Sequence, residues 1–202
     1  MKRIFLTGIG TEIGKTFCSA IVVEALKADY WKPVQAGDLH FSDTDKVQKL
    51  VSNSTSVFHA NSYALNTPMR PQAAAEIDGV QIKLSDIKEP KTQNHLVIEG
   101  AGGLFVPLND KETIFDIIKQ EYKVIVVSRH YLGSINHTLL TVNALKEKGF
   151  DVSIIFSGDE HPTTESIIEK MTQVSVLGRI DDEPYFDQNV IKEYATKFKE
   201  VL

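Results

Sequence analysis

Residues 3–16 read RIFLTGIGTEIGKT, an apolar stretch that enters a glycine-containing loop ending in Gly-Lys-Thr. The apolar start predicts a buried strand, and the SAIVVEALK that follows predicts a helix beginning near Gly14. In such a loop the backbone N–H groups converge on nucleotide phosphates, a lysine supplies positive charge, and a hydroxyl can coordinate Mg²⁺. Lys15 and Thr16 stand at these two positions, and the helix adds the positive end of its dipole.

The spacing of this loop departs from the common pattern. Five residues separate Gly8 from Gly14 where that pattern has four, and Ile9 stands where glycine is usual. A chance Gly-Lys-Thr in a surface turn is the alternative interpretation. The strand before the loop and the helix after it supply the context that a nucleotide site requires, so we predict a variant nucleotide-binding loop.

Composition is typical of a compact enzyme. The chain has 202 residues with 42% hydrophobic content, which predicts one domain over residues 1–202 with a substantial core. A net charge of −5 without a long basic run argues against nucleic acid as the main partner. The apolar stretch after Arg3 is too short for a signal or membrane segment, and the only cysteine, Cys18, reads as core filler in a reducing compartment. We therefore expect a cytoplasmic protein without a membrane partner.

Short apolar runs alternate with helical patterns along the chain. Runs such as VIVV and SIIF are typical of strands buried on both faces of a parallel sheet. The pattern predicts a three-layer, doubly wound, mostly parallel α/β fold of the P-loop NTPase type. The polar region 38–92 is expected to hold site loops and one short helix. The expected strands lie near 3–7, 29–34, 95–99, 123–128, 151–157 and 174–178, and the expected helices near 14–27, 113–121, 134–148, 163–172 and 187–200.

Ligands of such sheets bind beyond the carboxyl ends of the strands, and four unusual segments follow predicted strands. They are GIGTEIGKT at 8–16, KPVQAG at 32–37, EGAGG at 99–103 and LGSINH at 132–137. Together with the DTD at 43–45 and the SVLGRI at 175–180, this ordered set resembles the dethiobiotin synthetase family over most of the chain.

That resemblance implies an ATP-dependent ring closure with Mg²⁺. The diamine 7,8-diaminononanoate captures CO2 as a carbamate, ATP phosphorylates the carbamate, and the second amine attacks to form the cyclic urea dethiobiotin. Lys15 and Lys32 would stabilise the anionic transition state, in which positioning and charge are the main contributions of the protein. The alternative interpretation is that Lys32 is an ordinary surface lysine without a catalytic role.

The resemblance also implies the remaining site residues. Thr16, Asp45 and Glu99 would supply oxygen ligands to Mg²⁺. Asp45 lies in a polar run and would alternatively cap a helix, whereas Glu99 ends a buried strand, where an unpaired carboxylate is costly. The catalytic residues would be Lys32, Lys15 and Thr11. The nucleotide and its metal would contact Glu12, Ile13, Gly14, Lys15, Thr16, Phe17, Asp45, Glu99, Gly100, Ala101 and Gly102.

The diamine would contact Thr11, Lys32 and Ala36, and its carboxylate would bind the helix start at Gly133, Ser134 and Asn136 across the interface of a homodimer. From the residues alone, Ser134 or Asn136 equally reads as a simple helix cap. The sequence departs from the family at three places. Ala36 replaces a frequent serine, for which Gln35 could substitute. Ser157 and Gly158 replace an asparagine that contacts adenine, and Ser128, Arg129 and His130 stand where small residues are more usual.

Two other functions share these signals. Partitioning and septum-positioning ATPases use the same loop and sheet, but they resemble one another in a lysine five positions before the loop lysine, where this chain has Gly10. A ligase or kinase with a different acceptor would use Lys32, Asp45 and Glu99 equally well. The acceptor pocket, expected around residues 67–75, separates these possibilities.

Overall fold

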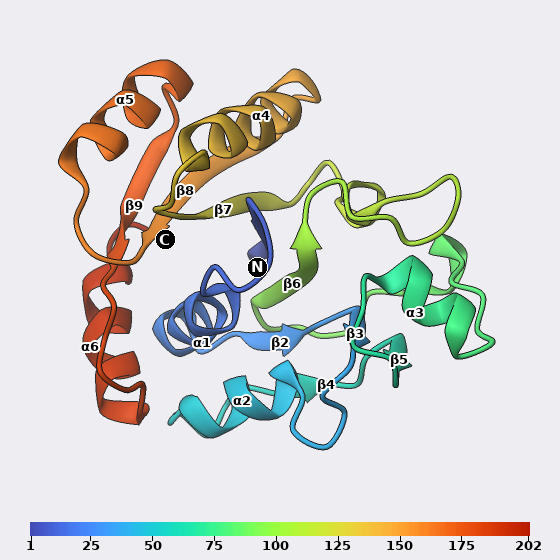
Figure 1. Ribbon diagram of the computed structural model, residues 1–202. Helices are drawn as coiled ribbons and strands as arrows, with labels where there is room; N and C mark the ends of the chain where they lie inside the picture. Colours follow the sequence, from blue (N-terminus) through green and yellow to red (C-terminus); the bar gives the residue numbers. More distant parts are fainter.

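The computed structural model describes residues 1–202 and is organised around a parallel sheet of seven strands (Figure 1). The order of the strands is β4-β2-β6-β1-β7-β8-β9. The central strand β1 (Arg3–Gly8) pairs with β6 (Leu96–Gly103) and with β7 (Lys123–Arg129). The outer strands are β2 (Asp29–Trp31), β4 (Phe58–His59), β8 (Asp151–Ser157) and β9 (Ser175–Ile180).

Side chains alternate between the two faces of this sheet, as the strand period of two requires. In β1, Phe5 enters one core cluster while Ile4 and Leu6 enter the other. Val126 and Val127 divide in the same way in β7. The continuous apolar runs of the sequence therefore belong to strands that are buried on both faces.

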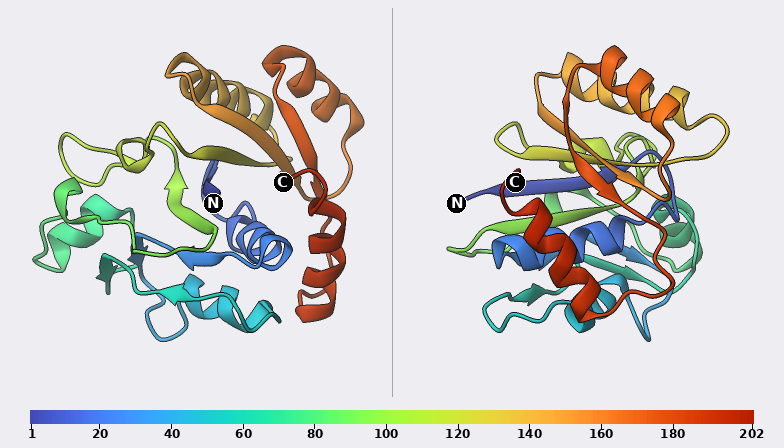
Figure 2. Two further views of the ribbon diagram at one scale, coloured as in Figure 1. Left: turned by 180° about the vertical axis from the view of Figure 1, so that it is seen from behind. Right: turned by 90° about the vertical axis from the view of Figure 1, so that its left-hand side faces the viewer.

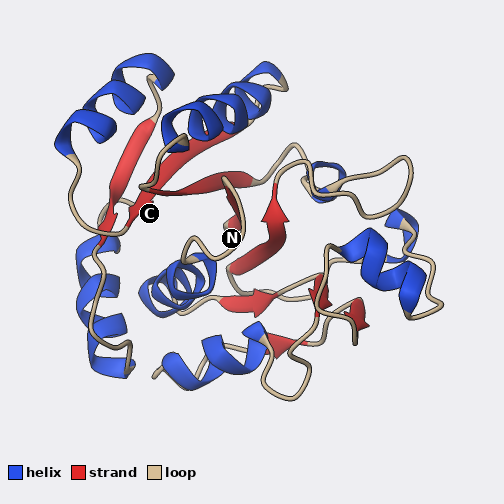
Figure 3. Ribbon diagram, in the orientation of Figure 1, coloured by secondary structure: helices blue, strands red, loops and turns tan.

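Helices cover both faces of the sheet (Figures 2 and 3). The face with Ile4 packs against α1 (Lys15–Leu26), α2 (Asp43–Leu50) and α6 (Gln188–Phe198). The face with Phe5 packs against α3 (Pro71–Ile77), α4 (Ser134–Glu147) and α5 (Pro162–Thr172). The predicted three-layer α/β fold is confirmed, and the ranges expected for α1, α4, α5 and α6 are confirmed to within two residues. No helix is both long enough and apolar enough to cross a bilayer.

The strand predicted over 29–34 is wrong in part, because it is divided into two elements. β2 ends at Trp31, and β3 (Val34–Ala36) pairs with β5 (Tyr63–Leu65) in a separate two-stranded parallel sheet. Pro33 has no N–H for a ladder and interrupts the strand. Its carbonyl accepts hydrogen bonds from the N–H groups of Ser62 and Tyr63 instead. The break carries Lys32 out of the sheet and toward the site.

The helix predicted over 113–121 is also wrong. Only a 3-10 turn, η2 (Ile114–Ile117), forms there. The apolar spacing of Ile114, Ile117 and Ile118 is helical, but the N–H groups of Ile114 and Phe115 donate to the carbonyls of Val106 and Leu104. Long-range pairing therefore replaces helix propagation.

Region 38–92 contains more regular structure than predicted. Besides β4 and β5 it holds two α-helices, α2 and α3, and a 3-10 turn, η1 (Leu84–Asp86). The prediction of a single short helix is corrected accordingly. These elements are short, so their periodicity in the sequence is weak.

Glu89 connects the loop before β6 to the rest of the fold, and it predicts an acid-sensitive stability. Burial would raise the pKa of Glu89, but hydrogen bonds from Lys119, Tyr122 and Arg3 lower it to about 2. Because the folded pKa lies below the ordinary value, this stabilisation is present above about pH 4.5 and is lost as pH falls toward 2. We expect Glu89→Gln to lower the free energy of unfolding by about 1–2 kcal/mol at pH 7, allowing for solvent screening.

Urea unfolding at pH 7 and pH 2.5 checks this expectation. The difference between wild type and Glu89→Gln should shrink at the lower pH. A difference that does not change between the two pH values would contradict the role of the ionised carboxylate.

Candidate active site

The loop between β1 and α1 is closed by one of its own side chains. The buried Ile13 lies against Gly8, where an added Cβ would be 2.1 Å from the Ile13 side chain. Gly14 has φ +89°, and an added Cβ there would lie 2.7 Å from Ser157 Oγ. The left-handed conformation and this close approach both favour glycine at position 14. The apolar side chain of Ile13 thus fills the space beside Gly8, and this packing accommodates the extra residue of the variant loop.

Lys15 lies at the start of α1 and is largely buried. Its Nζ donates a hydrogen bond of 2.8 Å to the carbonyl oxygen of Gly10, across the mouth of the loop. Burial lowers the pKa of Lys15 to about 8, although Glu99 opposes the shift. An anion in the loop would supply the countercharge that this ammonium lacks.

Glu99 is the most buried acid of the site, at 1% exposed. Its Oε2 accepts hydrogen bonds from Ser19 Oγ at 2.7 Å and from Tyr30 Oη at 2.9 Å. Its Oε1 accepts hydrogen bonds from Lys32 Nζ at 3.0 Å and from Thr16 Oγ1 at 3.3 Å. One carboxylate oxygen is therefore fixed by neutral hydroxyls, while the other faces the cationic side of the pocket.

Lys32 bridges two carboxylates. Its buried ammonium pairs with Glu99 Oε1 and with Asp43 Oδ2. Burial alone would lower the pKa of Lys32, but attraction to Glu99 and Asp43 raises it. Lys32 is therefore a protonated, anchored cation and not the ordinary surface lysine of the alternative interpretation.

Asp45, which the sequence predicted as a metal ligand, does not line the pocket. Asp45 Oδ2 accepts hydrogen bonds from the backbone N–H and the hydroxyl of Ser42, while the Asp45 N–H donates to Ser42 Oγ. This reciprocal pattern is a capping box at the start of α2. Asp43, two residues earlier, points into the pocket instead and pairs with Lys32 and Lys46. The Ser-x-x-Asp spacing of residues 42–45 is typical of a capping box, and it could have indicated that Asp45 caps α2.

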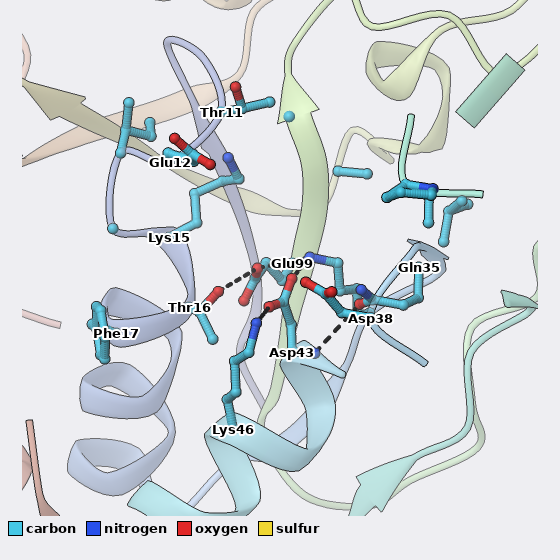
Figure 4. Close-up of a pocket in the computed structure, with 18 of the residues that line it drawn as sticks. Thr11, Glu12, Lys15, Thr16, Phe17, Gln35, Asp38, Asp43, Lys46 and Glu99 are labelled. Atoms are coloured by element: carbon cyan, nitrogen blue, oxygen red, sulfur yellow. Dashed lines mark hydrogen bonds and ion pairs between the residues drawn. The ribbon is translucent and has the colours of Figure 1, made fainter. Parts of the chain in front are cut away.

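One pocket joins the loop, β3, α2 and the start of α3, with a volume of about 990 Å³ (Figure 4). It brings together most residues predicted for the site: Thr11, Glu12, Ile13, Gly14, Lys15, Thr16, Phe17, Lys32, Ala36, Glu99, Ala101 and Gly102. The segment expected around residues 67–75 contributes Pro68, Met69, Arg70 and Pro71 to the lining. The pocket also contains residues that the sequence did not single out, among them Asp38, Asp43, Lys46 and Phe186.

Besides Asp45, four residues predicted for the site lie outside this pocket. Gly100 packs against the core, because an added Cβ would lie 3.1 Å from Phe5 and 3.2 Å from Ile114. Gly133 is the N-cap of α4, with Ser134 buried behind it and Asn136 exposed. The segment 133–136 of the same chain is therefore not joined to the pocket that holds Lys32.

The structure shows which groups contact the residues that depart from the family pattern. Ala36 and the neighbouring Gln35 both line the pocket, and the Gln35 amide also donates to the Gly37 carbonyl and accepts from the Asp43 N–H. Ser157 abuts Gly14. Arg129 forms a two-pronged ion pair with Asp182, at 2.9 and 2.8 Å.

A phosphate loop at the carboxyl edge of a parallel sheet, with a lysine and a buried carboxylate beside it, defines a P-loop nucleotide-binding protein. A family model described as an AAA domain matches residues 2–190. The ATP-dependent dethiobiotin synthetase BioD of Christiangramia forsetii is 66% identical over 202 residues, covering 100% of this chain and 98% of that protein. The chain belongs to the dethiobiotin synthetase family.

More distant relatives carry the same description. The BioD of Cytophaga hutchinsonii is 46% identical over 98% of this chain and 97% of its own, and that of Chlamydia pneumoniae is 39% identical over 100% and 91%. Both matches extend across nearly the whole chain, so the relationship is not confined to the phosphate loop.

Solved structures share the fold at low identity. A putative plasmid partition protein of Borrelia burgdorferi, bound to AMPPNP, superimposes with a TM-score of 0.63 at 15% identity, covering 99% of this chain and 97% of that one. The MinD cell division protein of Aquifex aeolicus gives 0.57 at 12% identity, covering 99% and 98%. These similarities concern the fold alone.

Proposed function

We propose that this chain catalyses the ATP-dependent closure of 7,8-diaminononanoate with CO2 to dethiobiotin, a step of biotin biosynthesis, as one cytoplasmic domain. The observation that carries the proposal is the full-length match to a dethiobiotin synthetase at 66% identity. The pocket supports it, because it places Lys15, Lys32 and two carboxylates together beside the phosphate loop.

Hard oxygen donors in the pocket fit Mg²⁺. Thr16 Oγ1, Glu99 Oε1 and Asp43 offer a hydroxyl and two carboxylates, the ligand types that this ion prefers. Asp43 takes the place that the sequence assigned to Asp45. When bound, Mg²⁺ would neutralise phosphate charge and orient the triphosphate.

The first chemical step joins the carbamate to phosphate. A carbamate oxygen attacks the γ-phosphorus of ATP, the bond to the bridging oxygen breaks, and ADP leaves. Lys15 in the loop stabilises the transferring phosphoryl group, and the protonated Lys32 stabilises the carbamate and the transition state. Lys32 is suited to this role because Glu99 and Asp43 keep it charged and in place.

The second step closes the ring. The second amine attacks the carbonyl carbon of the carbamic-phosphoric anhydride, the C–O bond breaks, and phosphate leaves with the former carbamate oxygen. Thr11 lines the same pocket and would contact the carbamate end. Met69 and Val106 also line the pocket, and their apolar side chains would contact the carbon chain of the diamine.

An oxygen label tests this sequence of steps directly. With ¹⁸O-labelled bicarbonate, one labelled oxygen should appear in the released phosphate, because the bridging oxygen of the anhydride comes from the carbamate. Phosphate without label, formed together with dethiobiotin, would show that a different intermediate is used.

The pair Asp43 and Asp45 gives a test of the proposed metal site. Asp43→Asn should lower kcat by about 100-fold, since it removes a partner of Lys32 and a proposed ligand. Asp45→Asn should leave kcat unchanged and cost about 1 kcal/mol of stability through the weakened cap. Steady-state kinetics and urea unfolding of both variants measure these effects. A large loss of kcat in Asp45→Asn with little loss in Asp43→Asn would show that Asp45, and not Asp43, is the metal ligand.

A homodimer would bring the helix start at 133–136 of one protomer to the pocket of the other. Support comes from the apolar surface beside this segment, where Leu132 is fully exposed and Tyr131 and Leu140 are also exposed. A patch of this kind is typical of an interface. The N–H groups at the start of α4 would then bind the carboxylate of the diamine.

Leu132→Asp tests the dimer, because a charge at this position would oppose its burial. Light scattering should find a dimer for the wild type and a monomer for the variant. The KM for the diamine should rise about tenfold or more, while the KM for ATP changes little. A wild-type monomer would remove this part of the proposal.

A partitioning-type ATPase is the less favoured function. Gly10 stands where those proteins resemble one another in a lysine, and its carbonyl accepts the hydrogen bond of Lys15. Such an ATPase would release phosphate without the diamine.

A further inference from the structure

Two buried hydroxyl groups contact Glu99 and have no place in the reaction described above. Ser19 Oγ and Tyr30 Oη donate hydrogen bonds of 2.7 and 2.9 Å to the same carboxylate oxygen, Oε2. Both side chains are completely buried, and neither lines the pocket. Any influence of these hydroxyls on the site therefore passes through Glu99.

The positions of both hydroxyls follow from the sheet and from α1. Tyr30 lies opposite Val97 in the parallel pair of β2 and β6, and Glu99 is two residues after Val97, so the three side chains share one face of the sheet. α1 covers this face, and Ser19 follows Thr16 by three residues, which places both of these hydroxyls on the same side of the helix. Glu99 therefore points into the layer between the sheet and α1.

The two oxygens of Glu99 have different partners. Oε2 accepts from the two neutral hydroxyls, which occupy both of its lone-pair positions. Oε1 accepts from the Lys32 ammonium at 3.0 Å and from Thr16 Oγ1 at 3.3 Å. The Thr16 contact is the longest of these hydrogen bonds, and Thr16 is itself a proposed metal ligand. The lone pair of Oε1 that faces Thr16 is therefore the part of the carboxylate that a metal ion can use.

We propose that Ser19 and Tyr30 are positioning residues that restrict Glu99 to metal binding through Oε1, and that this restriction favours Mg²⁺ over Ca²⁺. The proposal deepens the Mg²⁺ site of the proposed function and rests on it. Mg²⁺ requires an octahedral set of ligands at short distances, whereas the larger Ca²⁺ takes more oxygen ligands, often both oxygens of one carboxylate. A carboxylate with one oxygen already engaged suits the smaller ion.

The competing explanation is that the hydroxyls only satisfy a buried carboxylate. Tyr30→Phe and Ser19→Ala each remove one hydroxyl and leave the other on Oε2, so this oxygen keeps a donor. Tyr122→Phe is the matched control, because Tyr122 is also a buried tyrosine that donates to a carboxylate, that of Glu89, away from the pocket. A purely structural role predicts lower thermal stability in both tyrosine variants and no change in metal preference.

Displacement of bound Mn²⁺ tests the proposal, with paramagnetic resonance as the readout and a saturating non-hydrolysable ATP analogue present. The affinity for Mn²⁺ is measured first, and Mg²⁺ and Ca²⁺ are then titrated against it in the wild type and in each variant. We expect Tyr30→Phe and Ser19→Ala to bind Mg²⁺ about tenfold more weakly than the wild type, because they lose a group that orients a ligand. Their affinity for Ca²⁺ should change by less than about twofold, so the preference for Mg²⁺ should fall. Tyr122→Phe should match the wild type for both ions.

Unchanged affinity for Mg²⁺ in Tyr30→Phe and Ser19→Ala would overturn the proposal, because the hydroxyls would not position Glu99. An equal weakening of Mg²⁺ and Ca²⁺ would also overturn it, because Oε2 would play no part in the choice of ion. The same shift in Tyr122→Phe would show a general effect of lost stability. Failure of the proposed function has a different signature, since a wild type that binds Mg²⁺ with the ATP analogue but forms no dethiobiotin would leave the result on metal preference intact.

Discussion

Lys32→Ala should lower kcat by about 100- to 1000-fold while leaving the Kd of Mg-ATP within about threefold of wild type. The reason is the position of Lys32, which faces the two carboxylates at the strand break and not the phosphate loop. A positioned charge that acts on the transition state typically contributes about 3–4 kcal/mol. Lys15 remains in the variant to hold the nucleotide.

Stopped-flow measurement of phosphate release, combined with calorimetric titration of nucleotide, separates the two effects of Lys32→Ala. Lys123→Ala, a surface lysine that pairs with Asp151, is the control and should match wild type. Full turnover in Lys32→Ala would show that the catalytic role of Lys32 is wrong. A loss of nucleotide affinity as large as the loss in rate would instead place Lys32 among the nucleotide contacts.

Glu99→Gln should cost about 1000-fold in kcat, far more than it costs in stability. The variant keeps the shape of the side chain and the hydroxyl partners Ser19 and Tyr30. It removes the charge that Thr16 and Lys32 face. Because Asp43 keeps Lys32 paired, the cost to the free energy of unfolding should stay near 1–2 kcal/mol.

A second carboxylate provides the matched control. Glu89→Gln removes a paired carboxylate far from the pocket and should lower stability without changing kcat. If Glu99→Gln retained more than about a tenth of the wild-type kcat at saturating Mg²⁺, its carboxylate would not be a metal ligand. Binding of Mn²⁺ with ATP, followed by paramagnetic resonance, should weaken in Glu99→Gln and not in Glu89→Gln.

The fold could be predicted because its signals are local. The apolar runs at β1, β7 and β8 are continuous and β-branched, and α4 and α5 have ends that the sequence marks. The helix expected over 113–121 failed because the N–H of Ile114 finds the Val106 carbonyl. The sequence of residues 113–121 does not indicate that their N–H groups will donate to carbonyls outside the segment.

The site could be predicted where a residue has a fixed place on a strand end or loop. Lys15, Thr16 and Glu99 meet in the pocket because β1 and β6 are neighbours in the sheet. Asp43 and Asp45 lie in the same turn of α2, and only the direction of each side chain decides which of them faces the pocket. The resemblance to the family did not specify that direction.

Phe186 had no sequence signal, since it reaches the pocket from the loop before the last helix. Its contact with Phe17 depends on the packing of α6 against α1.

The most direct test of the proposed activity is phosphate release from Mg-ATP with bicarbonate, with and without 7,8-diaminononanoate, while dethiobiotin is followed by mass spectrometry. We predict release that requires both bicarbonate and the diamine, with one dethiobiotin formed for each phosphate. Release that proceeds equally without the diamine, or that yields no dethiobiotin, would contradict the ring-closing function.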